Sequence, residues 1–283
     1  MMPSNSEMRK IHPVPNADRP ETTLIPGNEN PIASLTGEAI GMKHFMHYKA
    51  IAFDFDYTLA DSSKGIIECV NFALKALDLS PASNENIRKT IGLPLSQTFI
   101  QLAGPENKIK CKEFSALFKS RADEVMTDLT YVYPATADII PALKSYGLEI
   151  AIISTKFRYR VIEFLTRENL LGYFDQVIGG EDVQNHKPHP EALFLALRKL
   201  NLAPSEILYV GDSLPDAMAT REANIPFLAV LTGVTGQRDF AQYPSVGIIR
   251  NLYGVTDYLF QDEVTMSRNQ GVGPRRTIAP KDK

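Results

Sequence analysis

FDFDYTL, residues 53–59, closes the first strongly apolar run of the chain and places two carboxylates, Asp54 and Asp56, directly behind it. Two acids two residues apart project to the same side when the chain is extended. Leaving them together after a buried run is costly unless a cation or a shared proton compensates. The alternative is a turn in which aspartate side chains accept hydrogen bonds from local backbone N–H groups. Taken alone, the pair leaves both interpretations open.

Further apolar runs of strand length follow along the chain. Together with the run that contains Asp54, five are predicted to be buried strands, at residues 50–55, 149–154, 176–179, 207–211 and 226–231. Residues 157–169 and 189–200 have the spacing of helices. The order of strand, helix and strand predicts a doubly wound parallel sheet with helices on both faces, which is an α/β fold.

A long stretch of purely helical spacing interrupts this order at about residues 65–133. Apolar residues line one face of a first helix and one face of a later helix: Ile66, Val70, Ala73 and Leu77, then Phe114, Leu117, Phe118 and Val125. We expect a helical cap over the end of the sheet, with the α/β core at residues 48–64 and 134–262.

The two ends of the chain differ from this central part. Residues 1–47 carry six prolines and no sustained periodicity, and residues 263–283 scatter glycine and proline among basic residues. Both segments are predicted to be flexible extensions. Met42 and Met46 lie just before the first strand, so a later start of the chain is an alternative.

Composition narrows the class of protein. The chain has 283 residues, 44% hydrophobic and 22% charged, as folded globular proteins do. A net charge of −3 offers no broad attraction for nucleic acid. Two cysteines, Cys69 and Cys111, favour a reducing cytoplasm over a disulfide framework. No apolar run reaches bilayer length, and no signal peptide is evident. We expect a cytoplasmic protein with a small-molecule partner, not nucleic acid or a membrane, and leave a homodimer open.

Three further polar segments follow the later predicted strands. They are Ser154-Thr155-Lys156, His186-Lys187-Pro188 and Gly211-Asp212-Ser213-Leu214-Pro215-Asp216. Each has an ordinary alternative, respectively a helix cap, a solvated lysine and a turn. Four separate ordinary explanations do not account for an acid pair, a hydroxyl, a lysine and a second acid pair that each follow a predicted strand. Open α/β sheets hold their ligands at the carboxyl ends of strands, so these segments would meet there. The four segments together therefore predict one site.

Phosphoryl transfer requires this set of groups. Asp54 would attack phosphorus and form an aspartyl-phosphate, and Asp56 would protonate the leaving oxygen and then activate water. Mg²⁺ between Asp54 and Asp212 would offset the charge of the phosphate. Lys187 would add a second positive charge, and the Ser154 hydroxyl would donate to a phosphoryl oxygen. The sequence therefore predicts a magnesium-dependent phosphatase.

The pattern resembles the haloacid dehalogenase superfamily, and most of all its phosphoglycolate phosphatase-like branch, over about residues 48–262. The resemblance is carried by Asp-x-Asp-x-Thr at residues 54–58, Ser154, Lys187-Pro188 and Gly-Asp-x-x-x-Asp at residues 211–216. It implies a Rossmann-like core, a cap inserted after the first strand, and hydrolysis of a small phosphorylated metabolite.

The resemblance also implies roles for particular residues. The backbone carbonyl of Asp56 would ligate the metal together with Asp54 and Asp212, and Asp216 would support the metal site and Lys187. Thr155 stands where close relatives often carry asparagine. This departure leaves the phosphate site intact but changes a hydrogen-bond donor, and Thr155 is expected to bind substrate with Ser154 and Lys187.

Other activities of the superfamily fit the sequence less well than a phosphatase. A dehalogenase would not need Asp56, and a phosphonate-cleaving enzyme would need a Schiff-base lysine that no spacing in the cap singles out. A non-catalytic binding module should have lost at least one motif, and none is damaged. A sugar phosphomutase is the main rival, because it uses the same acid pair.

The cap sequence favours hydrolysis over sugar isomerisation. Residues 90–96 resemble a cap loop that faces the active site, although an ordinary interhelix loop is the alternative. Within it, residues 92–96 offer only Ser96 as a side-chain anchor, with Gln97 just beyond, which is sparse for holding a sugar in two orientations. Arg158 and Arg160 either reach a substrate anion or form the solvated face of the next helix.

Overall fold

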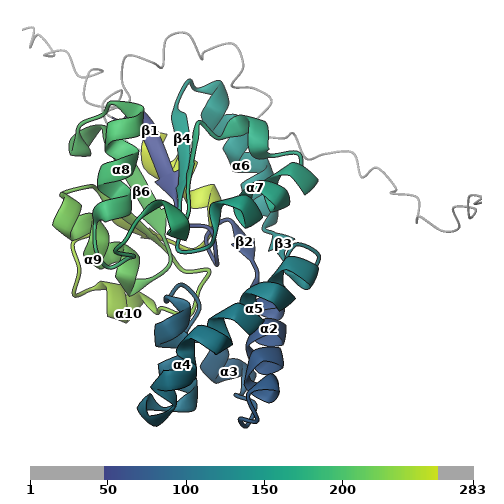
Figure 1. Ribbon diagram of the computed structural model, residues 1–283. Helices are drawn as coiled ribbons and strands as arrows, with labels where there is room; N and C mark the ends of the chain where they lie inside the picture. The colour runs from purple at the N-terminus through teal and green to yellow at the C-terminus, as the bar shows by residue number, and fades with distance from the viewer. Residues whose placement is uncertain (1–47, 261–283) are drawn as a thin grey trace, which may run out of the picture. The chain divides into compact units, whose positions relative to one another are not determined.

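Strand β1 (Ala50–Phe53) is buried at every position and forms the centre of a parallel sheet. The computed structural model, which describes residues 48–260, places β4 (Glu149–Ile153) and β6 (Ile207–Gly211) on either side of it (Figure 1). The outer strands are β5 (Gln176–Ile178), β7 (Phe227–Val230) and β8 (Gly247–Ile249). The order β5-β4-β1-β6-β7-β8 confirms the predicted parallel sheet, while β8 was not anticipated from the sequence.

The register sets the carboxyl ends of the three central strands level with one another. Phe53 of β1 pairs with Ile152 of β4 and with Val210 of β6. Residues that follow these strands therefore meet at one edge of the sheet, where open α/β folds hold their ligands.

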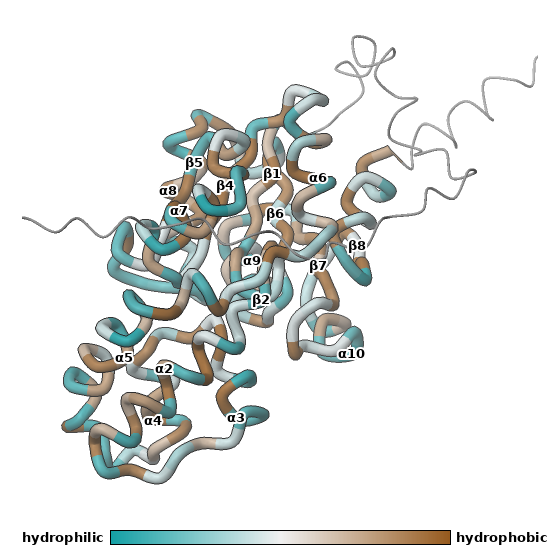
Figure 2. The backbone as a smooth tube through the Cα atoms, turned by 90° about the vertical axis from the view of Figure 1, so that its right-hand side faces the viewer, coloured by the Kyte–Doolittle hydropathy of each residue, from teal (hydrophilic) through white to brown (hydrophobic). Residues whose placement is uncertain are grey.

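Helices cover both faces of the sheet, as predicted. Ile51 and Phe53 of β1 pack with α6 (Pro134–Ser145) and α7 (Arg158–Arg167) on one face. The alternate residues Ala50 and Ala52 pack on the other face with α8, α9 and α10, at Glu191–Leu200, Leu214–Ala223 and Gln237–Phe240. Side chains alternate along a strand, so both faces of a central strand must be apolar to be covered. Figure 2 shows this hydrophobic character along the central strands.

The inserted segment is mainly helical and has its own core, but the stretch predicted to be purely helical ends in a short strand at Tyr131–Val132. It contains α2 (Ser63–Ala76), α3 (Asn84–Arg88), α4 (Leu95–Ala103), a 3₁₀ helix (Pro105–Lys110) and α5 (Cys111–Val125). The two apolar faces expected from the sequence belong to α2 and α5 and pack against each other. Phe114 of α5 also contacts Phe99 of α4, with ring centroids 4.7 Å apart. We call residues 63–125 the cap.

A short antiparallel ribbon joins the cap to the core. The chain leaves the core through β2 (Ala60–Asp61) and returns through β3 (Tyr131–Val132). Before β2 it makes a tight turn in which the Leu59 N–H donates to the Phe55 carbonyl at 2.9 Å and Tyr57 has φ of 63°. The hinge of the cap is therefore continuous with the acid motif.

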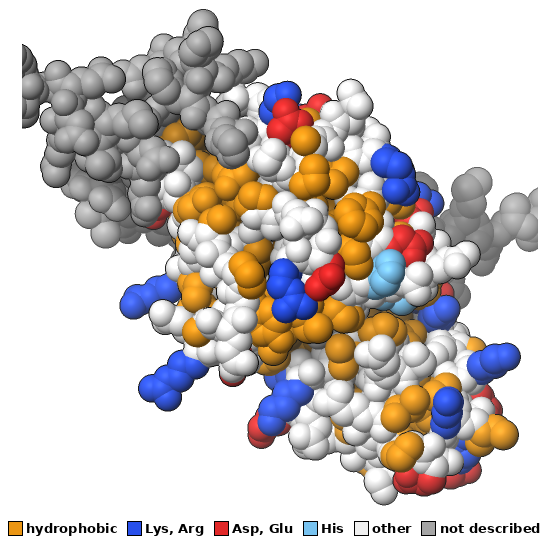
Figure 3. Space-filling model, turned by 90° about the vertical axis from the view of Figure 1, so that its left-hand side faces the viewer, with side chains coloured by type: hydrophobic (Ala, Val, Ile, Leu, Met, Phe, Trp, Pro, Cys, Tyr) orange, Lys and Arg blue, Asp and Glu red, His pale blue; other side chains and the backbone are white. Residues whose placement is uncertain are grey.

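Several predictions concern residues that the structure does not describe. The flexible extensions at residues 1–47 and 263–283, and the alternative start at Met42, lie outside the described residues. None of the helices within residues 48–260 combines the length and the hydrophobicity that a bilayer crossing requires. On the face shown in Figure 3, lysine and arginine side chains lie apart from one another, among acidic and hydrophobic ones.

Candidate active site

Four buried charged residues meet at the carboxyl edge of the sheet. Asp54 follows β1, Asp212 and Asp216 follow β6, and Lys187 lies in the loop after β5; none is more than 4% exposed. Oxygen atoms of the three carboxylates lie within 4.8 Å of one another. Lys187 Nζ lies 2.9 Å from Asp54 Oδ1 and 2.6 Å from Asp216 Oδ1. We call these four residues the Asp–Lys cluster.

Burial and proximity shift the protonation equilibria of the cluster. Burial raises the pKa of Asp54 to about 6, with the positive charge of Lys187 opposing the rise. Burial, followed by the negative charges of Asp216 and Asp54, holds the pKa of Asp212 well above its usual value. Burial alone would lower the pKa of Lys187, but the charges of Asp216 and Asp54 outweigh it and raise that pKa. Lys187 therefore stays protonated at neutral pH.

Asp216 and Tyr209 hold Lys187 in place. Asp216 Oδ1 accepts hydrogen bonds from Lys187 Nζ and from the Tyr209 hydroxyl, the latter at 3.0 Å. Its Oδ2 accepts from the Ser213 backbone N–H at 3.1 Å, in the capping box that begins α9. The Lys187 ammonium also donates to Tyr209 and to the Ile153 carbonyl, at 3.0 and 3.2 Å. Both carboxylate oxygens of Asp216 are thus already occupied by protein donors.

Asp54 and Asp212 fit a divalent cation better than Asp216 does. Asp54 Oδ1 is buried without a donor in hydrogen-bond geometry, since Lys187 is close but not suitably directed. Asp212 Oδ1 accepts one hydrogen bond, from the Thr58 hydroxyl at 3.1 Å. A Cβ at Gly233 would lie 1.8 Å from Asp212 Oδ2, so only glycine allows this close approach. Buried carboxylate oxygens with free lone pairs are the donors that Mg²⁺ prefers.

Asp56 faces different partners from Asp54. Its carboxylate accepts hydrogen bonds from the Ser62 hydroxyl and from Lys156 Nζ, the latter at 2.9 Å. The strand ends at Phe53, so the two acids do not lie on one extended segment, and Asp54 contacts Lys187 instead. Neither Ser62 nor Lys156 is among the site residues predicted from the sequence. Lys156 carried a signal, because it directly follows the hydroxyl motif.

The hydroxyl motif lies between the core and the cap. Ser154 is 5% exposed, and its hydroxyl accepts from the Lys156 backbone N–H at 3.3 Å. It follows β4 by one residue, as Asp54 follows β1 and Asp212 follows β6. The Thr155 hydroxyl donates to the Gly92 carbonyl of the cap loop at 3.1 Å. Thr155 thus connects the end of β4 to the cap loop.

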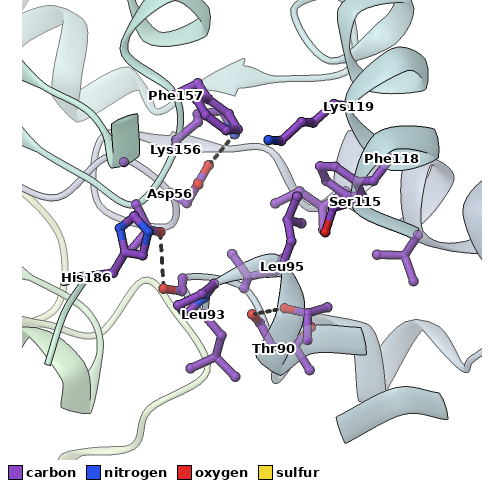
Figure 4. Close-up of a pocket in the computed structure, with 18 of the residues that line it drawn as sticks. Asp56, Thr90, Leu93, Leu95, Ser115, Phe118, Lys119, Lys156, Phe157 and His186 are labelled. Carbon is purple, nitrogen blue, oxygen red and sulfur yellow. Dashed lines mark hydrogen bonds and ion pairs between the residues drawn. The ribbon is translucent and has the colours of Figure 1, made fainter. Parts of the chain in front are cut away.

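A cavity of about 320 Å³ lies between the cap and this edge of the core (Figure 4). Asp56 and Lys156 line its core side, whereas Asp54 does not line it. The whole loop of residues 90–96 lines its cap side, as the sequence resemblance predicted. We call this space the cap cavity.

Side chains of α7 hold the cap against the core. Arg160 is 4% exposed, and its Nη2 lies 2.6 Å from Asp123 Oδ1 and 2.8 Å from the Lys119 carbonyl, both on α5. The Tyr159 hydroxyl also donates to Asp123, at 2.6 Å. The expectation of a solvated Arg160 is wrong, because the cap buries this side chain. Arg158 is 42% exposed and pairs with Asp182.

Comparisons with known proteins agree with this geometry. The family model described as haloacid dehalogenase-like hydrolase matches residues 51–230. The phosphoglycolate phosphatase of Escherichia coli (strain K12) is 32% identical over 218 residues, covering 68% of this chain and 84% of that protein.

Solved structures show the same similarity. A haloacid dehalogenase-like hydrolase from Bacteroides fragilis is 39% identical with a TM-score of 0.71, and the match covers 74% of this chain and 99% of that one. A protein from Haemophilus somnus 129PT, described as a predicted phosphoglycolate phosphatase, is 27% identical with a TM-score of 0.68, and the match covers 75% and 97% of the two chains.

Proposed function

The chain belongs to the haloacid dehalogenase-like hydrolases, and we propose that it is a Mg²⁺-dependent phosphatase that hydrolyses a small phosphomonoester through an aspartyl-phosphate on Asp54. The family assignment confirms the resemblance predicted from the motifs. The observation that carries the proposal is the buried ion pair of Asp54 and Lys187 beside two further carboxylates at the end of β1. Such a cluster is expensive to bury, so it indicates a chemical role.

Asp54 is the proposed nucleophile. One carboxylate oxygen attacks phosphorus, the bond from phosphorus to the leaving oxygen breaks, and an aspartyl-phosphate remains. Mg²⁺ held by Asp54, Asp212 and the backbone carbonyl of Asp56 would offset the negative charge of the phosphoryl group during this displacement. The Thr58 hydroxyl orients Asp212 through its 3.1 Å hydrogen bond.

Lys187 and Ser154 bind the transferred group. The Lys187 ammonium is held by Asp216 and Tyr209 and stays charged, so it supplies a fixed positive charge to phosphoryl oxygens. The Ser154 hydroxyl, one residue beyond β4, donates to the same group. Because these donors are already positioned, little reorganisation is needed as charge develops on the phosphoryl oxygens.

Asp56 is the proposed general acid and base. It donates a proton to the leaving oxygen and then accepts one from the water that cleaves the aspartyl-phosphate. Its carboxylate lines the cap cavity, where the leaving group would lie. Ser62 and Lys156 fix its orientation through their contacts with Oδ1.

The cap limits the substrate to a small molecule. A cavity of about 320 Å³ is at the lower end of the range for ligand pockets, and the contacts of Asp123 hold the cap over it. The curated relative is named a phosphoglycolate phosphatase, so a phosphoglycolate-like metabolite is the proposed class, and a cytoplasmic location fits such a substrate. A sugar phosphomutase remains the rival.

The decisive experiment follows phosphate release and enzyme phosphorylation together. The purified full chain should release inorganic phosphate from small phosphomonoesters with Mg²⁺ and stop reversibly with EDTA. Acid-quenched protein should carry phosphate on the peptide containing Asp54. Asp54→Asn should lower the turnover rate by about 10³-fold or more, because an amide cannot form the acyl phosphate.

A matched control and a competing outcome complete this test. Asp78→Asn changes an exposed cap aspartate whose φ of 56° asparagine also tolerates, and it should leave turnover unchanged. Undiminished turnover by Asp54→Asn would contradict the mechanism. Isomerisation of glucose 1-phosphate faster than phosphate release, with a bisphosphate primer present, would favour the mutase.

A further inference from the structure

One cation of the cap faces the cavity and forms no ion pair with any residue that the structure describes. Among the charged residues that line the cap cavity, Lys156 pairs with Asp56 and Arg160 pairs with Asp123. Within residues 48–260, Lys119 of α5 has no carboxylate within ion-pair distance, although its charge acts at longer range on Asp123, one turn further along α5. Its Nζ lies 4.5 Å from the centroid of the Phe157 ring, and Figure 4 shows the side chain extending from α5 into the cavity.

The backbone of Lys119 is held in place by the core. Its carbonyl accepts a hydrogen bond from Arg160 Nη2 at 2.8 Å. Ser115, Phe118 and Lys119 occupy positions i, i+3 and i+4 of α5, so they share the helix face that lines the cavity. A lysine on an exposed helix normally extends into water. This one lies over an aromatic ring at the cavity wall, so its ammonium is available to a ligand inside.

The rest of the cap wall offers little to a polar ligand. Val70, Leu95 and Phe118 of the cap, with Met126 directly after it, contribute apolar surface. The hydroxyls of Ser115, Thr90 and Thr98 all donate to backbone carbonyls, which leaves Ser96 among the hydroxyl side chains of the cap wall. A neutral polyol would therefore find few hydrogen-bond partners there, whereas an anion would find Lys119.

We propose that Lys119 determines specificity by binding a second anionic group of the substrate, so that the enzyme selects phosphomonoesters that also carry a carboxylate. This inference rests on the proposed phosphatase function. The phosphate would lie at the Asp–Lys cluster and the leaving group would project past Asp56 into the cap cavity. An ammonium without an ion pair at the far wall binds a carboxylate there more strongly than a neutral group of the same shape, because the pair adds charge to the hydrogen bond.

The test compares substrates that differ only in the second anion. 2-Phosphoglycolate is paired with 2-hydroxyethyl phosphate, and 3-phosphoglycerate with glycerol 3-phosphate. For the full chain with Mg²⁺, kcat/KM should favour the carboxylate of at least one pair. Lys119→Met should reduce that preference ratio by roughly tenfold or more, the size of a lost charged hydrogen bond. Lys119→Arg keeps the positive charge and should restore most of the preference.

Lys112→Met is the matched control. Lys112 is an exposed lysine of the same helix that does not line the cavity, so its loss should leave the ratio unchanged. Three results would overturn the inference while leaving the phosphatase intact: no preference for carboxylates in the parent enzyme, equal losses on both members of a pair in Lys119→Met, or the same change in Lys112→Met. Absence of phosphate release from every substrate would overturn the proposed function, and this inference with it.

Discussion

The Asp–Lys cluster and the cap cavity differ in whether their charged groups are buried and paired. In the cluster every charged group is buried and has a charged neighbour within 4.8 Å. Around the cavity the wall is mostly apolar, and Lys119 is exposed and unpaired among the described residues. The cluster belongs to strand ends of one rigid sheet, whereas the cavity depends on two regions joined by the β2–β3 ribbon.

Under the proposed function, this difference separates two tasks. Groups that act on the phosphoryl centre must be in place before substrate arrives, because electrostatic stabilisation depends on fixed donors. A region that selects the leaving group can keep an unsatisfied cation, since the substrate itself supplies the partner. The following predictions test this separation, from the largest expected effect to the smallest.

Asp56 is the residue on which the separation could fail, because it belongs to the acid motif and also lines the cap cavity. Asp56→Asn should lower kcat by roughly 10²–10⁴-fold for alkyl phosphates, the usual contribution of a general acid. The loss should be smaller for p-nitrophenyl phosphate, whose leaving group needs little protonation. Steady-state kinetics with both substrates measures the difference, and equal losses would argue against leaving-group protonation by Asp56.

The cluster should couple Mg²⁺ binding to pH. Burial raises the pKa of Asp54 to about 6, and burial together with the charges of Asp216 and Asp54 holds the pKa of Asp212 well above its usual value. A raised carboxyl pKa favours the protonated folded state, so the metal-free protein should lose stability as pH rises from about 4 through 6 and beyond. Mg²⁺ needs the ionised carboxylates and should therefore stabilise more at pH 8 than at pH 5.5.

Thermal unfolding with increasing Mg²⁺ at the two pH values measures this coupling. Saturation at about 100 times Kd corresponds to about 2.7 kcal/mol of stabilisation. Asp212→Asn should remove most of the increment at pH 8, while Asp78→Asn should retain it. An increment of the same size at both pH values would show that the cluster is not the metal site.

Tyr209→Phe tests whether the cluster depends on uncharged supports. The mutation removes a hydroxyl that contacts Lys187, Asp216 and the Ile153 carbonyl. The free energy of unfolding should fall by about 1–3 kcal/mol, because buried polar groups lose a partner. Activity should fall through kcat more than through KM, since Lys187 loses its orientation. Tyr173→Phe is the control, because it removes a tyrosine hydroxyl that forms no hydrogen bond with another described residue. An equal fall in unfolding free energy and kcat in this variant would contradict the prediction.

Asp123→Asn weakens the contact between the cap and the core. Its carboxylate accepts from Tyr159 and Arg160, but its side chain is 54% exposed, so the cost in stability should stay below about 1 kcal/mol. KM should rise a few-fold because the cap closes less firmly, with kcat on p-nitrophenyl phosphate nearly unchanged. A large fall in kcat would show that cap closure and the chemistry of the cluster are not separate.

The strands, the cap insertion and the four motif segments could be predicted from the sequence for a local reason. A buried strand is a continuous apolar run, and a motif residue lies within a few positions of the strand that carries it. The order of these segments then requires them to meet at one sheet edge. Helix α6 and strand β8 were missed, because Pro141 interrupts the helical spacing of the first and the second has only three residues.

Contacts between distant segments required the tertiary structure. Asp56 and Lys156 are 100 positions apart, and Arg160 and Asp123 are 37 apart, so no local period links either pair. Tyr209 is a weak signal in the sequence, because it is a polar ring within an apolar strand. Its contact with Lys187 depends on the tertiary arrangement that places β6 beside β1. Local residue order determines which segments become strands, helices and motif loops. Which charges neutralise one another, and which cation is left facing the cavity, depends on how the cap packs against the core.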